Sequence, residues 1–131
     1  MNPNSGGPEQ APGEQPVAGE PEVTQVLDGD CARLTVVGEL TEPARRPLVR
    51  SVTDLLLEQS ALRRVELHLQ AVGFMNSAGL ALLVQVQRLC APRGIGVALV
   101  EPSSAVAKPL RLSGLWHRFE VVEADDPPAE E

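Results

Sequence analysis

The stretch FMNSAGLALLVQVQRLC, residues 74–90, places a single hydroxyl, that of Ser77, directly before a long apolar run. A serine in this position can do one of two things. Its oxygen can accept a hydrogen bond from a backbone N–H group and cap a helix. Alternatively, it can stand exposed as a nucleophile or as a phosphate acceptor. Asn76 and Ser77 are both good caps, so the rest of the chain must decide between these roles.

Nucleophilic catalysis by Ser77 lacks the surrounding residues that it requires. The nucleophile elbow G-x-S-x-G is absent, because Met75 stands two residues before the serine. The two histidines, His68 and His117, cannot be connected to Ser77 by spacing. Two histidines and two cysteines at unrelated positions give no metal-binding pattern, and no glycine-rich phosphate loop occurs. We therefore expect a protein that is not an enzyme, with no metal and no cofactor of its own.

Composition predicts one domain between two acidic tails. The chain has 131 residues, of which 43% are hydrophobic but only 2% aromatic, so the core must consist mainly of Leu, Val and Ala. Residues 1–22 contain four acids and no base, residues 123–131 contain five acids and no base, and the former are rich in Pro and Gly. Such segments bury too little to fold, so both are predicted to be disordered. Residues 23–122 then form the domain.

The same composition excludes several classes of protein. The net charge of −7 belongs to the tails, and the remaining basic residues are too few and too scattered for a nucleic-acid surface. The uncharged stretch 67–87 contains too many polar residues to span a bilayer, which requires about 20 mainly apolar residues. Neither a signal peptide nor a disulfide framework is evident. We expect a cytoplasmic protein that binds neither membrane nor nucleic acid, in an oligomeric state that the sequence leaves open.

Hydrophobic periodicity predicts an α/β domain. Apolar residues alternate with polar ones along residues 31–40 and 64–70, as in strands with one face in the core. Asp28-Gly29 predicts a turn that joins the first of these strands to a preceding one over residues 23–30. The other predicted elements are helices over 44–59, 77–91 and part of 103–113, and strands over 95–100 and 119–122.

The predicted order is β-β-α-β-α-β-α-β, a mixed sheet of four to five strands. Strand–helix–strand alternation gives parallel neighbours joined by right-handed crossovers, and the opening hairpin adds an antiparallel pair. Because Glu66, His68 and Gln70 alternate with apolar residues, one face of the sheet should be open. The helices are therefore expected mainly on the other face.

The helix predicted over residues 77–91 has one face without large apolar side chains. At about 100° per residue, Leu80, Leu82, Leu83 and their apolar neighbours fill a broad arc. The remaining arc contains small or polar residues, namely Ser77, Ala78, Ala81, Gln85 and Arg88. Such a face allows another protein to approach closely, although it is also typical of a solvent-facing helix.

Three segments together resemble the STAS domain family, and in particular the bacterial anti-sigma factor antagonists. VVGELT at residues 36–41 resembles the family's "GELD". RVELHLQAVGFMNSAGLALLV at residues 64–84 resembles its strand, "F-x-D-S-S-G-L" turn and helix, with Gly79 and Leu80 on the family's glycine and leucine. LSGLWHRFEVV at residues 112–122 resembles its C-terminal "L-x-x-S/T-G-L" before a last strand. The order and spacing of the segments agree with the predicted elements.

The resemblance implies a partner-switching regulator of transcription. In the family, a partner that is both an anti-sigma factor and an ATP-dependent serine kinase phosphorylates the serine that falls on Ser77. The unphosphorylated domain binds this partner and releases the sigma factor. ATP and Mg²⁺ would be bound by the partner. Around Ser77, the partner-binding residues would be Thr41, Asn76, Gly79, Ala81, Gln85 and Arg88.

Two departures from the family pattern favour an alternative. Asn76 replaces the aspartate before the serine, and Thr41 replaces the aspartate after "GEL". Both changes remove negative charge near Ser77. The alternative is a STAS module that is not phosphorylated and acts as a scaffold or as a subunit of a lipid-transport or stress-signalling assembly. The sequence does not name the anti-sigma factor, the sigma factor or the role of the tails.

Overall fold

The sheet opens with the hairpin that Asp28-Gly29 predicts. In the computed structural model, which describes residues 18–123, β1 (Glu22–Asp28) pairs antiparallel with β2 (Cys31–Leu40). Gly29 adopts a φ of +64°, a conformation that favours glycine. β1 begins one residue before the predicted boundary, and Pro21 before it is buried. The predicted tails over 1–17 and 124–131 lie outside the described residues.

Parallel strands complete the sheet. Its order is β1-β2-β3-β5-β6, in which β3 (Arg64–His68), β5 (Gly96–Val100) and β6 (Glu120–Val122) each run parallel to their neighbours. The register places Leu34 opposite Leu67 and Leu67 opposite Leu99. Central leucines of three strands therefore lie in one row, as the alternation of apolar residues predicts.

The sheet has a sixth strand that the sequence does not reveal. β4 (Val72–Met75) pairs parallel with the last residues of β2, next to an irregularity in register between Gly38 and Glu39. It contains only four residues, includes Gly73, and is buried at both ends and exposed in the middle, so it lacks the alternation that identifies a strand. The fold class is confirmed, with β4 added before the second helix.

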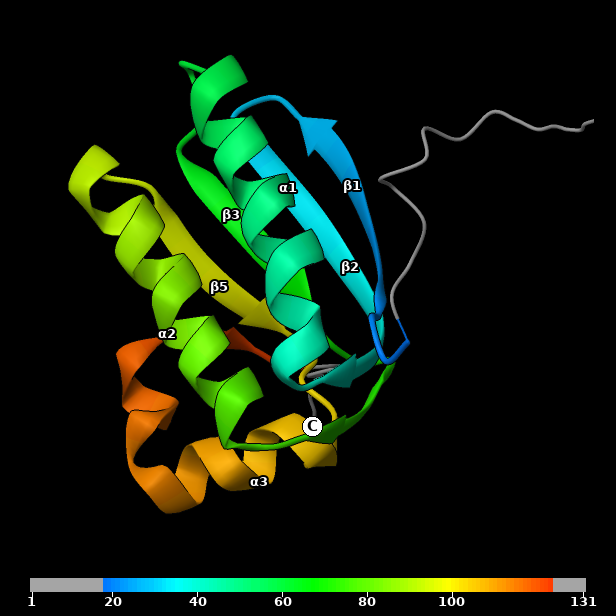
Figure 1. Cartoon of the computed structure of the whole chain (residues 1–131). Helices are drawn as coiled ribbons and strands as arrows, with labels where there is room; N and C mark the ends of the chain where they lie inside the picture. The colour runs from blue at the N-terminus through cyan, green and yellow to red at the C-terminus, as the bar shows by residue number, and fades with distance from the viewer. Residues whose placement is uncertain (1–17, 124–131) are drawn as a thin grey trace, which may run out of the picture.

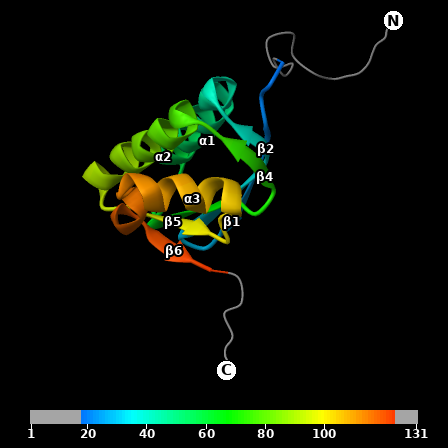
Figure 2. The ribbon, with the colours of Figure 1, turned by 90° about the horizontal axis from the view of Figure 1, so that it is seen from below.

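Two helices cover one face of the sheet. α1 (Arg45–Glu58) follows a 3₁₀ turn over Glu42–Ala44, and α2 (Ser77–Cys90) is followed by another over Ala91–Arg93. Figures 1 and 2 show the two helices side by side on the same face, with their N-termini at the same end. This end is where the carboxyl ends of the parallel strands meet, which is a common location for binding sites in α/β folds.

The third helix lies across the end of the sheet. α3 (Ser104–Ser113) contacts β4 and precedes a 3₁₀ turn over Leu115–Arg118 (Figure 1). The hydroxyl of Ser103 donates a hydrogen bond of 2.6 Å to the carbonyl oxygen of Val72. This bond attaches the start of α3 to β4, the strand that leads to Ser77.

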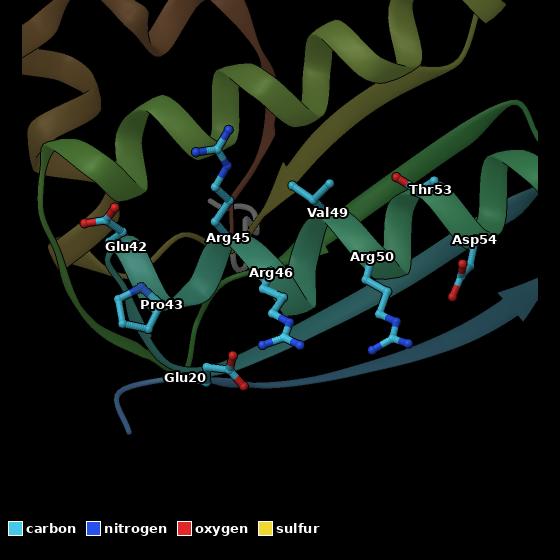
Figure 3. A pocket seen from close by; sticks show the side chains of 9 residues that line it. All are labelled: Glu20, Glu42, Pro43, Arg45, Arg46, Val49, Arg50, Thr53 and Asp54. Carbon is cyan, nitrogen blue, oxygen red and sulfur yellow. The ribbon is translucent and has the colours of Figure 1, made fainter. Parts of the chain in front are cut away.

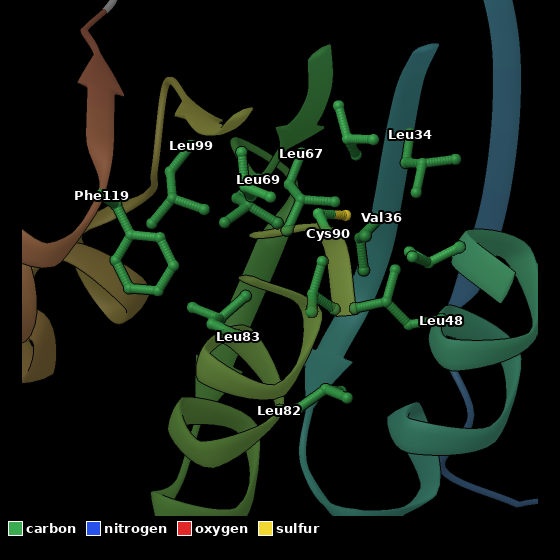
Figure 4. Packing of buried hydrophobic residues seen from close by; sticks show 14 of the residues in the cluster. Leu34, Val36, Leu48, Leu67, Leu69, Leu82, Leu83, Cys90, Leu99 and Phe119 are labelled. Atoms are coloured by element: carbon green, nitrogen blue, oxygen red, sulfur yellow. The ribbon is translucent and has the colours of Figure 1, made fainter. Parts of the chain in front are cut away.

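The core lies between the sheet and the helices and consists almost entirely of aliphatic side chains. Figure 4 shows Leu34, Leu67 and Leu99 of the strands packing against Leu48 of α1 and Leu83 of α2. The opposite face of the sheet carries Arg33, Glu66 and His68, which are exposed or half-buried. The predicted arrangement, with helices mainly on one face and a more open second face, is confirmed.

Candidate functional site at the start of α2

Asn76, and not Ser77, caps α2. The backbone of Asn76 is extended, and its Oδ1 accepts a hydrogen bond of 3.1 Å from the N–H group of Gly79. Ser77 is the first residue of the helix and is exposed. Its hydroxyl makes no hydrogen bond with any residue between 18 and 123. The capping role is therefore filled by the neighbouring residue, and the Ser77 hydroxyl is accessible from solvent.

The pairing of β4 with β2 brings two of the sequence segments together. Met75 lies opposite Leu40, and the N–H group of Asn76 donates a hydrogen bond of 3.3 Å to the Leu40 carbonyl oxygen. Thr41 and Asn76 thus each follow the end of one of two adjacent strands. Thr41 is half-buried, and its carbonyl oxygen accepts a hydrogen bond from the N–H group of Ala44 that starts the 3₁₀ turn before α1.

Gly79 has a structural role and does not form part of the exposed face. It is buried, and a Cβ atom on residue 79 would lie 2.6 Å from the carbonyl carbon of Leu40 and 2.8 Å from the Leu40 Cβ. Only glycine allows α2 to approach β2 this closely. Gly79 therefore lies beneath the exposed residues at the start of α2, and its assignment to the partner-binding residues stays a prediction.

The other predicted residues form an exposed strip along α2. Ser77, Asn76, Ala81 and Arg88 are exposed, and Gln85 is half-buried. A hollow of about 450 Å³ lies beside the later part of this strip and is lined by Ala81, Val84, Gln85 and Arg88. The strip therefore offers small side chains and a depression rather than a row of long charged side chains.

The start of α1 and the 3₁₀ turn before it contribute a part of the site that spacing alone does not reveal. A second hollow, of about 330 Å³, lies between the two helices and is lined by Glu42, Arg45, Ala78, Ala81, Leu82 and Gln85. Glu42 and Arg45 precede Ser77 by more than thirty positions in the chain. The sequence signals for them are that Glu42 directly follows Thr41 and that Arg45 belongs to a group of arginines at the start of the predicted helix. The hollow combines a carboxylate, a guanidinium and small apolar side chains at one helix–helix groove.

Phe74 is a second residue that the sequence analysis did not assign to the site. It lies in β4, two residues before Asn76, and half of its surface (50%) is exposed. The chain contains only two phenylalanines and one tryptophan, and the other phenylalanine, Phe119, is buried in the core. An exposed aromatic ring is a typical anchor for a protein partner, and Phe74 precedes Ser77 by only three residues.

The electrostatics at the start of α2 favour an anion. No acidic residue occupies the first turn, and the N–H groups of a first helical turn have no partner within the helix. Asn76 occupies one of these groups, that of Gly79. The positive end of the helix dipole therefore faces the Ser77 hydroxyl.

The titratable groups with shifted pKa values lie elsewhere. Glu66 and His68 are on the open face of the sheet, with His68 Nε2 3.0 Å from Glu66 Oε1. Burial disfavours the charged form of Glu66, but hydrogen bonds from Arg64 and His68 outweigh it and lower the pKa of this carboxyl. Between residues 18 and 123, no group of three His, Cys, Asp or Glu side chains is arranged to hold a metal ion.

These features define a single α/β domain with a mixed six-stranded sheet and an exposed strip on one helix. The family model described as "Mlab, STAS domain" matches residues 23–123, so the chain belongs to the STAS domain family. No curated protein sequence matches the chain significantly. Across the described part of the chain, no helix is long and apolar enough to cross a membrane.

Solved structures share the fold at low sequence identity. An anti-sigma factor antagonist from Mycobacterium paratuberculosis is 18% identical, with a TM-score of 0.69 over 82% of this chain and 90% of that one. The Thermotoga maritima protein TM1081 is 21% identical, with a TM-score of 0.68 over 78% of this chain and 86% of that one. The anti-sigma factor antagonist SpoIIAA, in its unphosphorylated form, is 15% identical, with a TM-score of 0.60 over 80% and 89%.

Proposed function

We propose that this protein is an anti-sigma factor antagonist that binds an anti-sigma factor with serine-kinase activity and is switched off by phosphorylation of Ser77. The observation that carries the proposal is the exposed Ser77 hydroxyl, which has no hydrogen-bond partner among residues 18–123 because Asn76 caps the helix. ATP and Mg²⁺ would be bound by the partner. The protein itself would bind its partner without catalysing a reaction.

The position of Ser77 lets the domain accommodate a phosphate. A phosphoserine carries about −1.5 to −2 charges at pH 7. At residue 77 it would face the positive end of α2 and the unpaired N–H groups of the first turn, which stabilises an anion by about 0.3–1 kcal/mol. The hydroxyl makes no internal contact that phosphorylation would break. The modification would therefore leave the fold intact.

A partner seated on the same strip would not accommodate it. The strip contains the small side chains Ala78 and Ala81, which allow close approach, and the nearby exposed ring of Phe74 supplies apolar area. Enclosing a phosphate in such an interface removes a charge from water without a prepared counter-charge, which costs several kcal/mol. Since about 1.4 kcal/mol is a tenfold change in affinity, phosphorylation would release the partner.

A second candidate function is a STAS interaction module that is not phosphorylated. This candidate is supported by Thr41 and Asn76, which stand where the family pattern has aspartates and follow the ends of two adjacent strands. One patch has thus lost both carboxylates. The matching family model is described as "Mlab, STAS domain", a description without the words anti-sigma factor antagonist. This candidate predicts stable copurification with scaffold or lipid-transport subunits.

The test of the proposed function is phosphorylation together with partner release. The purified protein would be incubated with its copurifying kinase and Mg-ATP, and the phosphate would be located by mass spectrometry. We expect it on Ser77 and expect Ser77→Asp to lose the partner in pull-downs while Ser77→Ala keeps it. Ser104→Asp is a matched control, because Ser104 is also an exposed first residue of a helix but lies on α3.

The two candidates give opposite results. Phosphate on Ser77 with loss of binding in Ser77→Asp supports the switch. A partner that remains bound to Ser77→Asp as tightly as to the wild type, with no phosphate on Ser77, supports the non-phosphorylated module.

A further inference from the structure

Three arginines on α1 have no partner within the described chain. Arg45, Arg46 and Arg50 are exposed, and none forms an ion pair or a side-chain hydrogen bond with any residue from 18 to 123. Arginines on the open face of the sheet differ in this respect. Arg33 pairs with Asp28 at 2.7 Å, and Arg64 pairs with Glu120 at 2.7 Å.

The location of these arginines is unfavourable for the isolated domain. They occupy the N-terminal half of α1, where the helix dipole is positive, and the first turn contains no acidic residue. Since none of the three forms a close ion pair within residues 18–123, they break this local rule, and such departures often occur at functional sites. The unpaired charges therefore point to a binding role outside the domain.

The same residues surround a hollow of about 640 Å³. Pro43 and Val49 add apolar side chains to its lining, and Glu20, Glu42 and Asp54 also line it. In Figure 3, Arg46 and Arg50 point together toward the side of β1 and Glu20, whereas Arg45 points toward α2. Arg46 and Arg50 are four residues apart, so they lie on one side of the helix, about 6 Å apart along its axis.

We propose that this hollow, the α1 groove, binds an acidic and partly apolar helical segment of a partner protein. Carboxylates spaced four residues apart on the segment would match Arg46 and Arg50, and apolar side chains of the segment would meet the apolar lining residues Pro43 and Val49. Charge complementarity selects this occupant over a membrane or a nucleic acid. The carboxylates of Glu42 and Asp54 in the groove would repel a continuous polyanion, whereas a peptide can place its charges beside the arginines only.

The α1 groove is continuous with the face around Ser77, because Glu42 and Arg45 line both this hollow and the one between the helices. A partner could therefore cover both surfaces. The inference does not require Ser77 to be phosphorylated and can be tested on the unmodified chain.

The test measures binding of a designed peptide to the full chain. The probe is a fluorescent helical peptide of about 15 residues, the length at which isolated helices become stable, with Glu at four-residue spacing and Leu on the same face. Fluorescence anisotropy at low salt should show binding to the wild type and to Ser77→Ala. The double variant Arg46→Glu/Arg50→Glu should bind about tenfold more weakly or worse. Adding salt should also weaken wild-type binding.

Arg63→Glu is the matched control, because Arg63 is exposed and its side chain has no partner among residues 18–123, yet it lies outside the groove. It should bind the peptide as the wild type does, and a peptide with Lys in place of Glu should not bind. Urea unfolding of each variant would establish that the fold is retained.

Four results would overturn the inference. The first is that the Glu peptide does not bind, and the second is that Arg63→Glu weakens peptide binding as much as Arg46→Glu/Arg50→Glu does. The third is that the protein prefers phosphatidylserine vesicles or duplex DNA to the peptide and that this binding depends on Arg46 and Arg50. The fourth is that the variant Glu9→Gln/Glu14→Gln binds the peptide markedly more tightly than the wild type. The last result would show that the N-terminal segment of the chain itself occupies the groove.

Discussion

Gly79, in the first turn of α2, packs directly against the carbonyl group of Leu40 at the end of β2. This contact fixes the distance between the helix that carries Ser77 and the strand that ends at Thr41. We expect Gly79→Ala to destabilise the domain by about 2–3 kcal/mol, because the added methyl group must displace backbone and not a flexible side chain. Urea unfolding, with the slope of the transition unchanged, would measure the loss.

Gly73→Ala is the control for this substitution. Gly73 lies in β4, its φ is not positive, and a Cβ atom there would meet nothing within 4 Å. Its effect should stay within about 0.5 kcal/mol. If Gly79→Ala were as stable as Gly73→Ala, α2 would not pack on Leu40 as described.

The sequence predicts the elements of this fold better than their contacts. Alternation along residues 31–40 and 64–70 identifies β2 and β3, because each strand has one buried face. β4 escapes prediction, since its four residues follow no period and its stability comes from pairing with β2. Elements stabilised mainly by tertiary contacts carry little local signal.

The candidate site, like the fold, could be predicted from the sequence only where local spacing determines it. The spacing along α2 correctly predicts that Ser77, Ala81 and Arg88 are exposed. It could not choose between Asn76 and Ser77 as the cap, because both side chains can accept the same hydrogen bond. It also could not place Glu42 and Arg45 beside Ala81, since that depends on how α1 and α2 pack.

At about 100° per residue, Gln87 falls within the apolar arc of α2, and its hydrogen bonds explain why a polar side chain is found there. Its Nε2 donates a hydrogen bond of 2.6 Å to the Arg118 carbonyl oxygen, and its Oε1 accepts one of 2.7 Å from Arg118 Nε. Arg118 is far away in the chain, so no local pattern predicts these bonds.

The cap of α2 predicts opposite outcomes for two substitutions of Asn76. Asn76→Ala removes the acceptor for the Gly79 N–H group and should cost about 1 kcal/mol. Asn76→Asp keeps the acceptor, adds a charge at the positive end of the helix, and should equal or exceed the wild type by up to about 1 kcal/mol. Thermal and urea unfolding at pH 7 would compare the three proteins. A stable Asn76→Ala would show that the cap contributes nothing.

The open face of the sheet predicts a pH dependence. Burial disfavours the charged form of Glu66, but Arg64 and His68 outweigh it and lower the pKa of this carboxyl in the folded state. Between the folded and the unfolded pKa of Glu66, the folded protein therefore binds fewer protons than the unfolded protein. Glu66 therefore contributes stability above its unfolded pKa of about 4.3, and this contribution is lost as the pH falls through the lower folded pKa. Glu66→Gln should reduce stability at pH 7 by about 1–2 kcal/mol.

Urea midpoints between about pH 3 and 7 would test this, since Glu66→Gln should show a shallower acid slope than the wild type. Glu39→Gln is the control, because Glu39 is exposed and has no ion pair within residues 18–123. Equal acid slopes in the wild type and Glu66→Gln would contradict the assignment.

The two thiols should react very differently. Burial raises the pKa of Cys90 to about 11, and Cys90 is fully buried in the core (Figure 4). At pH 8, roughly one part in a thousand of this thiol is ionised, and no reagent reaches it. Burial and the nearby Glu66 carboxylate also raise the pKa of Cys31, but this residue is only half-buried. A thiol-specific chromophore should label Cys31 slowly in the folded protein and Cys90 only after unfolding, and Cys31→Ser should abolish labelling of the folded protein.

The environment of Ser77 predicts that the stability of the domain does not depend on its hydroxyl and does not fall when a negative charge is placed there. Because the hydroxyl makes no hydrogen bond within the described chain, Ser77→Ala should change stability by less than about 0.5 kcal/mol. Ser77→Asp should be more stable by about 0.3–1 kcal/mol through the helix dipole, and this gain should shrink as salt is added. Ser104→Asp, at the matching position of α3, should show a similar small gain. A loss above about 1 kcal/mol in Ser77→Asp would contradict the prediction that the start of α2 tolerates negative charge.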